Sequence, residues 1–242
     1  MSRGTPGPWR TSPAVRIGLS LSVATGLYGI SFGALSVAAG LTFWQTVALS
    51  ALMFTGGSQF AFIGVLSGGG AGASALGAAT MLGVRNAVYG MSMNALVRPR
   101  GWRRLLAAHV TIDESNAAAS SQTDPLEERR GFWTAGLGVW VLWNAFTVLG
   151  ALLGNTLGDP ARWGLDGAAV AAFLGLLWPR LSAREPVAVA VACALVTALT
   201  IPLLPPGVPI LVAAVVAAVL GRTRGPRPAA AGPVGAGTGA GA

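Results

Sequence analysis

Long apolar segments follow one another along most of the chain, separated by short stretches rich in glycine, proline or arginine. Between Ile17 and Val84 there is no Asp, Glu, Arg, Lys or His. This stretch has room for about three membrane-crossing helices of about 20 residues each. Because a soluble domain would not leave so long a run uncharged, we predict an all-α, polytopic membrane protein.

The apolar segments together predict about six to seven transmembrane segments. Their expected ranges are 15–39, 42–66, 74–97, 132–153, 165–178, 187–204 and 208–220. We expect a disordered tail over 1–14, a transmembrane domain over 15–221 with a polar region over 98–131, and a second tail over 222–242. The second tail consists mostly of Pro, Ala and Gly without periodicity, which is typical of disorder.

The second apolar segment, 42–66, is interrupted in its middle by Gly56-Gly57-Ser58-Gln59. Two glycines weaken a helix, and Ser and Gln place polar groups at membrane depth. Such an interruption is tolerated where it is packed in protein or lines a cavity, as in the substrate sites of many transporters. We predict that 42–66 is broken or re-entrant; the alternative is that the glycines only let two helices pack closely.

Charged residues are scarce, and the positively charged ones are all of one type. Only 10% of the residues are charged, the formal net charge is +8, and every basic residue is Arg. The arginines fall between apolar spans instead of forming one dense patch, so they indicate membrane topology and not a nucleic-acid partner. With one His and one Cys, the chain offers neither a metal site nor an intrachain disulfide.

Arg85 lies about halfway along the third apolar segment, where a charge costs a few kcal/mol or more without a partner or water. On a helix, Arg85 and Asn86 share a face with Tyr89 through their spacing. A charge inside a membrane span indicates a functional site, so we predict a substrate site here. The alternative is that the helix starts late and Arg85 reaches the interface.

The polar region contains His109, Asp113 and Glu114 on a stretch, 105–122, with helical character. Four residues separate His109 from Asp113, so the two are expected to pair on one helix face. Asp113 and Glu114 are candidates for coupling to an ion if their helix enters the membrane. The sequence shows no nucleophile and base expected at one depth, so an intramembrane hydrolase is the weakest hypothesis.

Orientation gives conflicting signals. Arg-rich regions face the cytoplasm, which places the polar region, the loop at 180–184 and the C-terminus on that side. The N-terminus, with Arg3, Arg10 and Arg16, fits the same side, yet three full crossings would separate it from the polar region. Either 42–66 enters and leaves on one side, or the N-terminus is outside. We favour the first.

Four motifs give the chain a resemblance to a known family. These are Leu-Tyr-Gly-Ile-Ser-Phe-Gly at 27–33, leading to Ala-Gly-Leu at 39–41; the stretch 54–60; Arg-Asn-Ala-Val-Tyr-Gly at 85–90; and Asp113-Glu114. Over about 15–220 the sequence resembles the AzlC family of branched-chain amino-acid permeases. Gly83, Asn86 and Ile112 depart from the family pattern, which usually has Asn, His and Thr there, so proton coupling by that histidine would not carry over to Asn86.

The resemblance implies a multi-pass protein of the bacterial plasma membrane. It also implies export of branched-chain amino acids or their analogues, together with a small AzlD-type membrane partner. It does not settle the substrate.

Our hypothesis is therefore a secondary, alternating-access exporter of aliphatic amino acids, with no cofactor and no enzymatic activity. The proposed substrate site contains Gly56, Gly57, Ser58, Gln59, Arg85, Asn86 and Tyr89. The alternatives are a non-transporting membrane subunit that binds a partner, and a transporter of a different small solute.

Overall fold

The computed structural model describes Trp9, residues 12–157, residues 181–222 and scattered positions between 162 and 178. Within these residues the secondary structure is helical, without strands, as the apolar pattern predicts. The helices are α1 (Pro13–Ala38), α2 (Phe43–Leu52), α3 (Gly56–Ser67), α4 (Gly72–Val97), α5 (Arg103–His109), α6 (Asp113–Ser120), α7 (Pro125–Leu157), α9 (Arg184–Thr200) and α10 (Val208–Arg222). Half of the predicted span 165–178 and most of both tails lie outside the described residues.

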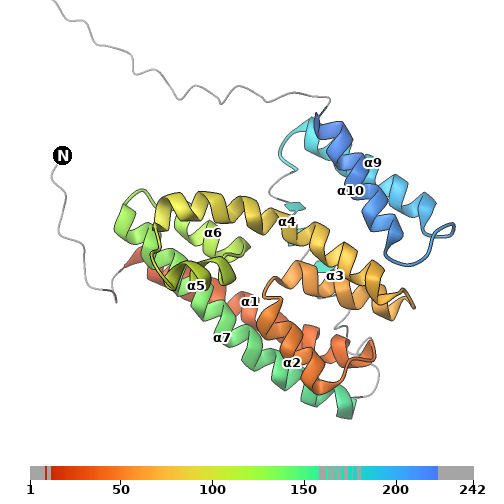
Figure 1. Ribbon diagram of the computed structural model, residues 1–242, viewed down its shortest axis with the longest axis horizontal. Coiled ribbons are helices and arrows are strands. Elements are labelled where there is room, and N and C mark those ends of the chain that lie inside the picture. The colour runs from red at the N-terminus through yellow and green to blue at the C-terminus, as the bar shows by residue number, and fades with distance from the viewer. Residues whose placement is uncertain are drawn as a thin grey trace, which may run out of the picture.

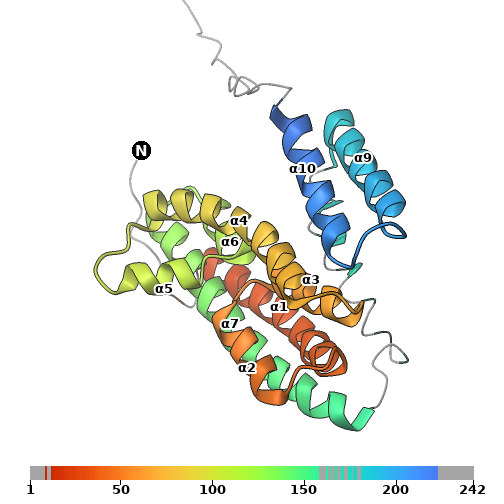
Figure 2. The same cartoon turned by 45° about the vertical axis from the view of Figure 1, so that its right-hand side comes forward.

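The two long helices α1 and α7 pack side by side and form the base of the fold (Figures 1 and 2). They are also the two described helices long and apolar enough to cross a membrane, with mean hydropathies of 1.5 and 1.7. Helix α1 begins at Pro13, because the Ser12 hydroxyl accepts a hydrogen bond from the Val15 amide and caps it. The helix therefore includes the last two residues of the predicted N-terminal tail. How many further helices cross the membrane stays a prediction.

Small residues let α1 and α7 approach almost backbone to backbone. A Cβ added at Gly29 would lie 2.7 Å from the Trp143 carbonyl oxygen, and one at Gly33 would collide with the Thr147 carbonyl. Gly29 and Gly33 form a GxxxG pair, a spacing that allows this close approach between helices. The partner is α7, which contributes Gly150 against the Ile30 backbone.

The predicted interruption of 42–66 lies at Met53–Thr55, between α2 and α3. Helix α2 begins with a capping box, in which Thr42 and Gln45 bond each other's backbone amides. The two glycines are not themselves unwound, since Gly56 and Gly57 form the first turn of α3. The break therefore precedes the two glycines, and the polar residues Ser58 and Gln59 belong to helix α3.

The polar region folds into two short helices instead of one, so the predicted continuous helix over 105–122 is wrong. Helix α5 ends at His109 and α6 starts at Asp113. The hydroxyl of Ser115 accepts a hydrogen bond from the Ile112 amide (2.9 Å) and donates to the Val110 carbonyl (2.8 Å). A side chain that satisfies the backbone in this way favours a turn over a continuing helix.

Helix α4 is 26 residues long. The residue that follows it and forms its C-cap, Arg98, adopts a left-handed conformation (φ 51°). Such a conformation costs a non-glycine residue about 1–2 kcal/mol. The Arg98 Nε atom donates to the Ala95 carbonyl, which helps to hold the turn. Helices α9 and α10 form a hairpin, turned at Gly207 (φ 91°), that contacts α4 through α10 (Figure 2).

Candidate functional site

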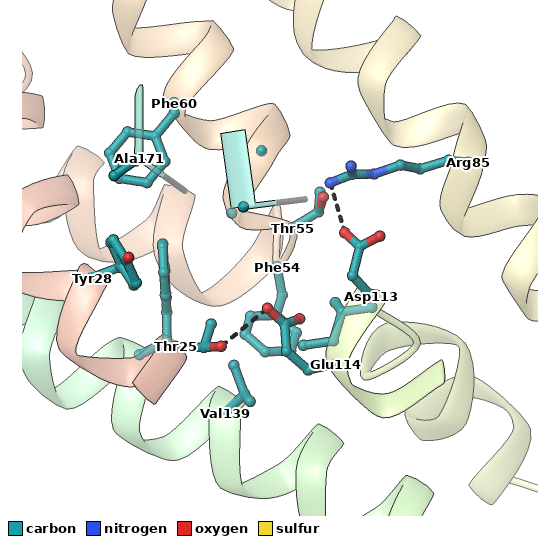
Figure 3. A pocket seen from close by; sticks show the side chains of 15 residues that line it. Thr25, Tyr28, Phe54, Thr55, Phe60, Arg85, Asp113, Glu114, Val139 and Ala171 are labelled. Carbon is teal, nitrogen blue, oxygen red and sulfur yellow. Dashed lines mark hydrogen bonds and ion pairs between the residues drawn. The ribbon is translucent and has the colours of Figure 1, made fainter. Parts of the chain in front are cut away.

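A cavity of about 210 Å³ lies where the break between α2 and α3 faces α1, α4, α6 and α7 (Figure 3). Its volume is below the roughly 300–1,000 Å³ typical of pockets for drug-sized ligands, so it suits a small solute. The lining consists of Thr25, Tyr28, Phe54, Thr55, Gly56, Gly57, Phe60, Arg85, Ile112, Asp113, Glu114, Val139, Trp143, Ala171 and Gly175.

One wall of the cavity carries an ion pair. The Arg85 guanidinium, from α4, lies 2.8 Å from the Asp113 carboxylate at the start of α6. The Tyr89 hydroxyl, one turn after Arg85, donates to the other oxygen of Asp113 at 2.9 Å. Arg85 therefore has an acidic partner in the protein, and the cost of its burial is offset by that pair.

Two hydrogen-bond donors at the cavity stay without a partner among the described residues. They are Arg85 Nε and Trp143 Nε1, and both atoms are buried. A buried donor left unpaired is costly and rare, so it commonly marks a place where a ligand or water binds. Both belong to residues that line the cavity.

A second carboxylate, that of Glu114, faces the cavity from the first turn of α6 (Figure 3). It accepts a hydrogen bond from the Thr25 hydroxyl of α1 at 3.1 Å. Its neighbour Asp113 takes the Arg85 ion pair. Burial raises the pKa of Glu114 above its ordinary value of 4.5, and the adjacent Asp113 charge raises it further. The cavity thus contains one carboxylate paired with a cation and one whose pKa is raised by burial.

The remaining walls are apolar and come mainly from aromatic residues. Phe54, Phe60 and Trp143 belong to one buried cluster with Phe32, in which the Phe32 and Trp143 rings stack at 5.9 Å. Gly56 lets Trp143 lie against the start of α3, since a Cβ there would be 3.2 Å from the indole ring. This rigid aromatic wall gives the polar groups a fixed apolar surface opposite them.

The first turn of α3 opens on the cavity through Gly56 and Gly57. The residue before the helix, Thr55, makes no side-chain hydrogen bond that caps it. The first amides of α3 therefore have no capping partner from Thr55, and a helix start of this kind favours an anionic group.

Four predicted site residues, Ser58, Gln59, Asn86 and Tyr89, do not line the cavity, and the contacts of Gln59 and Ser58 are structural. Gln59 is fully buried and donates from Nε2 to the carbonyls of Leu49 (3.0 Å) and Ser50 (3.3 Å) at the end of α2. Ser58 accepts a hydrogen bond from Thr55 across the start of α3. Gln59 therefore ties the two halves of the broken segment together.

Asn86 also lies outside the lining, and its Oδ1 atom is buried without a hydrogen bond from the described residues. Tyr89 reaches the site only through Asp113. The expected pairing of His109 with Asp113 on one helix face does not occur, because the helix ends between them. The His109 ring lies instead between Phe54 (5.9 Å) and Trp140 (6.4 Å).

Sequence reasoning missed Thr25 and Val139 as lining residues. Thr25 lies on the small-residue helix α1, where a hydroxyl gives no distinct signal. Among the described residues, no group of three or more His, Cys, Asp or Glu gathers in a way that suits a metal.

The described residues form an all-helical fold with two helices long and apolar enough to cross a membrane and with charged groups around a small cavity, an arrangement compatible with an integral membrane protein. The AzlC family model, described as "AzlC protein", matches residues 20–157, more than half of the chain. The protein is thus a member of the AzlC family, which is associated with transporters and is not a family of enzymes. Neither a curated protein nor a solved structure matches the chain.

Proposed function

We propose that this protein is a permease of the bacterial plasma membrane that exports branched-chain or other small aliphatic amino acids. In this proposal it works by alternating access, together with a small AzlD-type membrane partner. The observation that supports it most directly is the combination, in one small cavity, of unpaired donors, a helix start, a protonatable carboxylate and an aromatic wall.

The carboxylate of a zwitterionic amino acid would bind at the Arg85 side. Arg85 Nε and Trp143 Nε1 are buried donors that need an acceptor, and the first amides of α3 at Gly56 and Gly57 favour an anion. Because Asp113 already neutralises Arg85, the site as a whole does not attract anions strongly. This balance suits a molecule with no net charge.

The ammonium group would bind Glu114, whose Oε1 atom accepts a hydrogen bond from Thr25 and which has no ion pair within the described residues. The apolar side chain would then lie on Phe54 and Phe60, at the aromatic wall. Only small side chains fit beside the two charged ends in a cavity of about 210 Å³.

Glu114 also offers a means of coupling. A proton and a substrate ammonium compete for the same carboxylate, so release of one favours binding of the other. Alternating access requires an element with two arrangements, and the interruption at Met53–Thr55 is the place where α2 and α3 can change their relative angle.

The alternative function is a membrane subunit that assembles with a partner and does not itself transport. The observation that favours it is α9, none of whose residues is buried in the structure. In that case Arg85 and Glu114 would matter for stability but not for flux.

Efflux of preloaded labelled leucine from membrane vesicles, with the AzlD-type partner present, tests the proposal. Wild type is compared with Arg85→Ala and Glu114→Gln, and with Arg222→Ala as a charge-matched control at the exposed end of α10. We expect efflux by wild type and the control and at least a tenfold loss in the two cavity variants, with partner assembly unchanged. Normal efflux in both variants would refute the site assignment, and no efflux of any aliphatic amino acid by wild type would refute the substrate class.

A further inference from the structure

A second cavity, of about 630 Å³, lies at the connection between α4 and α5. This connection is at the left in Figure 2. Four arginines surround the cavity: Arg98, Arg100, Arg103 and Arg129. The other lining residues are Val97, Pro99, Trp102 and Trp133, so the cavity has no acidic residue in its walls. It is separate from the Arg85 cavity and shares no lining residue with it.

The four guanidinium groups have no acidic partner within the part of the chain that the structure describes, where the ion pairs are Arg85–Asp113 and Glu127–Arg130. Even Glu128, next to Arg129 in the sequence, does not line the cavity. Four like charges around one space repel each other, and an anion between them relieves that repulsion. Guanidinium groups form paired hydrogen bonds with the oxygens of a phosphate, so a phosphate group suits this cavity.

The backbone holds one of these arginines in place. Arg98 adopts the left-handed conformation usually left to glycine, and its Nε atom donates to the Ala95 carbonyl at 3.2 Å. Arg104 Nε fixes the same loop by donating to the Pro99 carbonyl at 3.1 Å. Arg98 is thereby presented at the cavity rim by a turn that glycine would form at less cost.

Two features indicate that the phosphate belongs to a lipid. Trp102, which is 70% exposed, and Trp133 flank the arginines, and tryptophan favours the headgroup level of a bilayer. On α4 and α5 beside the same Pro99 turn, a neighbouring groove of about 450 Å³ is lined mostly by apolar residues, among them Met91, Met93 and Phe132. A headgroup site adjoined by an apolar groove suits a phospholipid better than a soluble phosphate.

We propose that this arginine cavity binds the phosphate of an anionic phospholipid, with the headgroup between α4, α5 and α7. The site belongs to the membrane-facing part of the protein and does not depend on which solute the Arg85 cavity accepts. It fixes the C-terminal end of α4, the helix whose middle carries Arg85, so a bound lipid stabilises the helix that forms one wall of the central cavity.

Native mass spectrometry of the purified full-length protein tests this inference. Phosphatidylglycerol and phosphatidylcholine with identical acyl chains are titrated separately, and glycerol 1-phosphate serves as the soluble source of the same chemistry. The site variant is Arg100→Gln with Arg103→Gln. Its matched control is Arg184→Gln with Arg222→Gln, which removes the same charge from exposed positions on α9 and α10.

Wild type and the control should bind phosphatidylglycerol about tenfold or more tightly than phosphatidylcholine, and the site variant should lose that preference. Glycerol 1-phosphate should not displace the lipid at equal concentration. Retention of the preference in the site variant overturns the proposal, as does an equal loss in both double variants, which would indicate net charge alone. Displacement by glycerol 1-phosphate overturns the lipid assignment. If the double site variant does not fold, each single variant is measured against the same criteria.

Discussion

At the scale of single residues, the Arg85–Asp113 pair decides whether a charge can lie inside α4. The two side chains are 24% and 15% exposed, so each would lose solvation without adequate compensation if its partner were removed. We expect Arg85→Met or Asp113→Asn alone to lower the free energy of unfolding by about 1–3 kcal/mol. The double variant should lose less than the sum of the two, because it leaves no unpaired charge. Denaturation of all four proteins in one detergent measures this, and additive losses would mean that the pair contributes nothing.

Glu114 gives the site a dependence on pH. Its pKa in the folded protein is raised by burial, so the protein favours the protonated form. Ionising the buried carboxyl lowers the stability of the folded protein. This loss is absent below the ordinary pKa of 4.5 and grows as the pH rises from there through the raised pKa of the folded state. Wild type should therefore lose stability relative to Glu114→Gln as the pH rises above about 4.5.

Thermal unfolding of both proteins between about pH 4 and pH 8 measures this difference. Glu128→Gln is the control, because it removes a carboxylate that belongs to the polar region, 98–131, but does not line the cavity. If the melting temperatures of wild type and Glu114→Gln change in parallel with pH, the pKa of the Glu114 carboxylate is not raised.

At the scale of elements, the contact of α1 with α7 depends on having no side chains at the crossing. A methyl group at Gly33 would meet the Thr147 backbone, which cannot move aside as a side chain does. We expect Gly33→Ala to destabilise the protein by about 1–3 kcal/mol. Gly64→Ala in α3, where a Cβ meets nothing within 4 Å, should be neutral or stabilise by up to about 1 kcal/mol. Equal melting temperatures of the two variants would contradict the close contact.

The sequence predicted most elements but not their ends. Runs of apolar residues identified α1, α4, α7, α9 and α10, since length and hydropathy suffice for that. An interruption within 42–66 was also predicted from Gly-Gly-Ser-Gln, but this motif forms the start of α3 and the break lies just before it. The split between α5 and α6 was not, because it depends on Ser115 bonding the Ile112 amide, and a serine at that spacing is just as common inside helices.

The site was only partly predictable, because some of its contacts join residues that lie far apart in the sequence. Arg85, Gly56 and Glu114 stand out in a sequence poor in charge and interrupted by glycine. By contrast, Thr25 reaches Glu114 across 89 residues, which no local pattern indicates. Gln59 looked like a ligand-binding residue because it is polar in an apolar run, whereas its amide bonds the backbone at the end of α2. Burial of a polar side chain alone does not distinguish these two roles.

At the scale of the whole molecule, the central cavity forms only when five helices and the break come together. The chain provides a direct way to follow access to it, since Cys193 is the single cysteine. Replacing Cys193 by Ser and Thr55 by Cys would put one thiol in the cavity wall. Ser182→Cys, at an exposed position that does not line the cavity, is the matched control.

If the protein alternates access, the thiol at position 55 should react with an impermeant maleimide from either side of oriented vesicles. Saturating leucine should slow this reaction about tenfold, because a bound ligand excludes most of the reagent from so small a cavity. The thiol at position 182 should react from one side only and at a rate that leucine does not change. Reaction at position 55 from a single side, whatever the substrate concentration, would contradict alternating access and favour the subunit function. Two-sided reaction without protection would leave the movement in place but exclude leucine as its substrate.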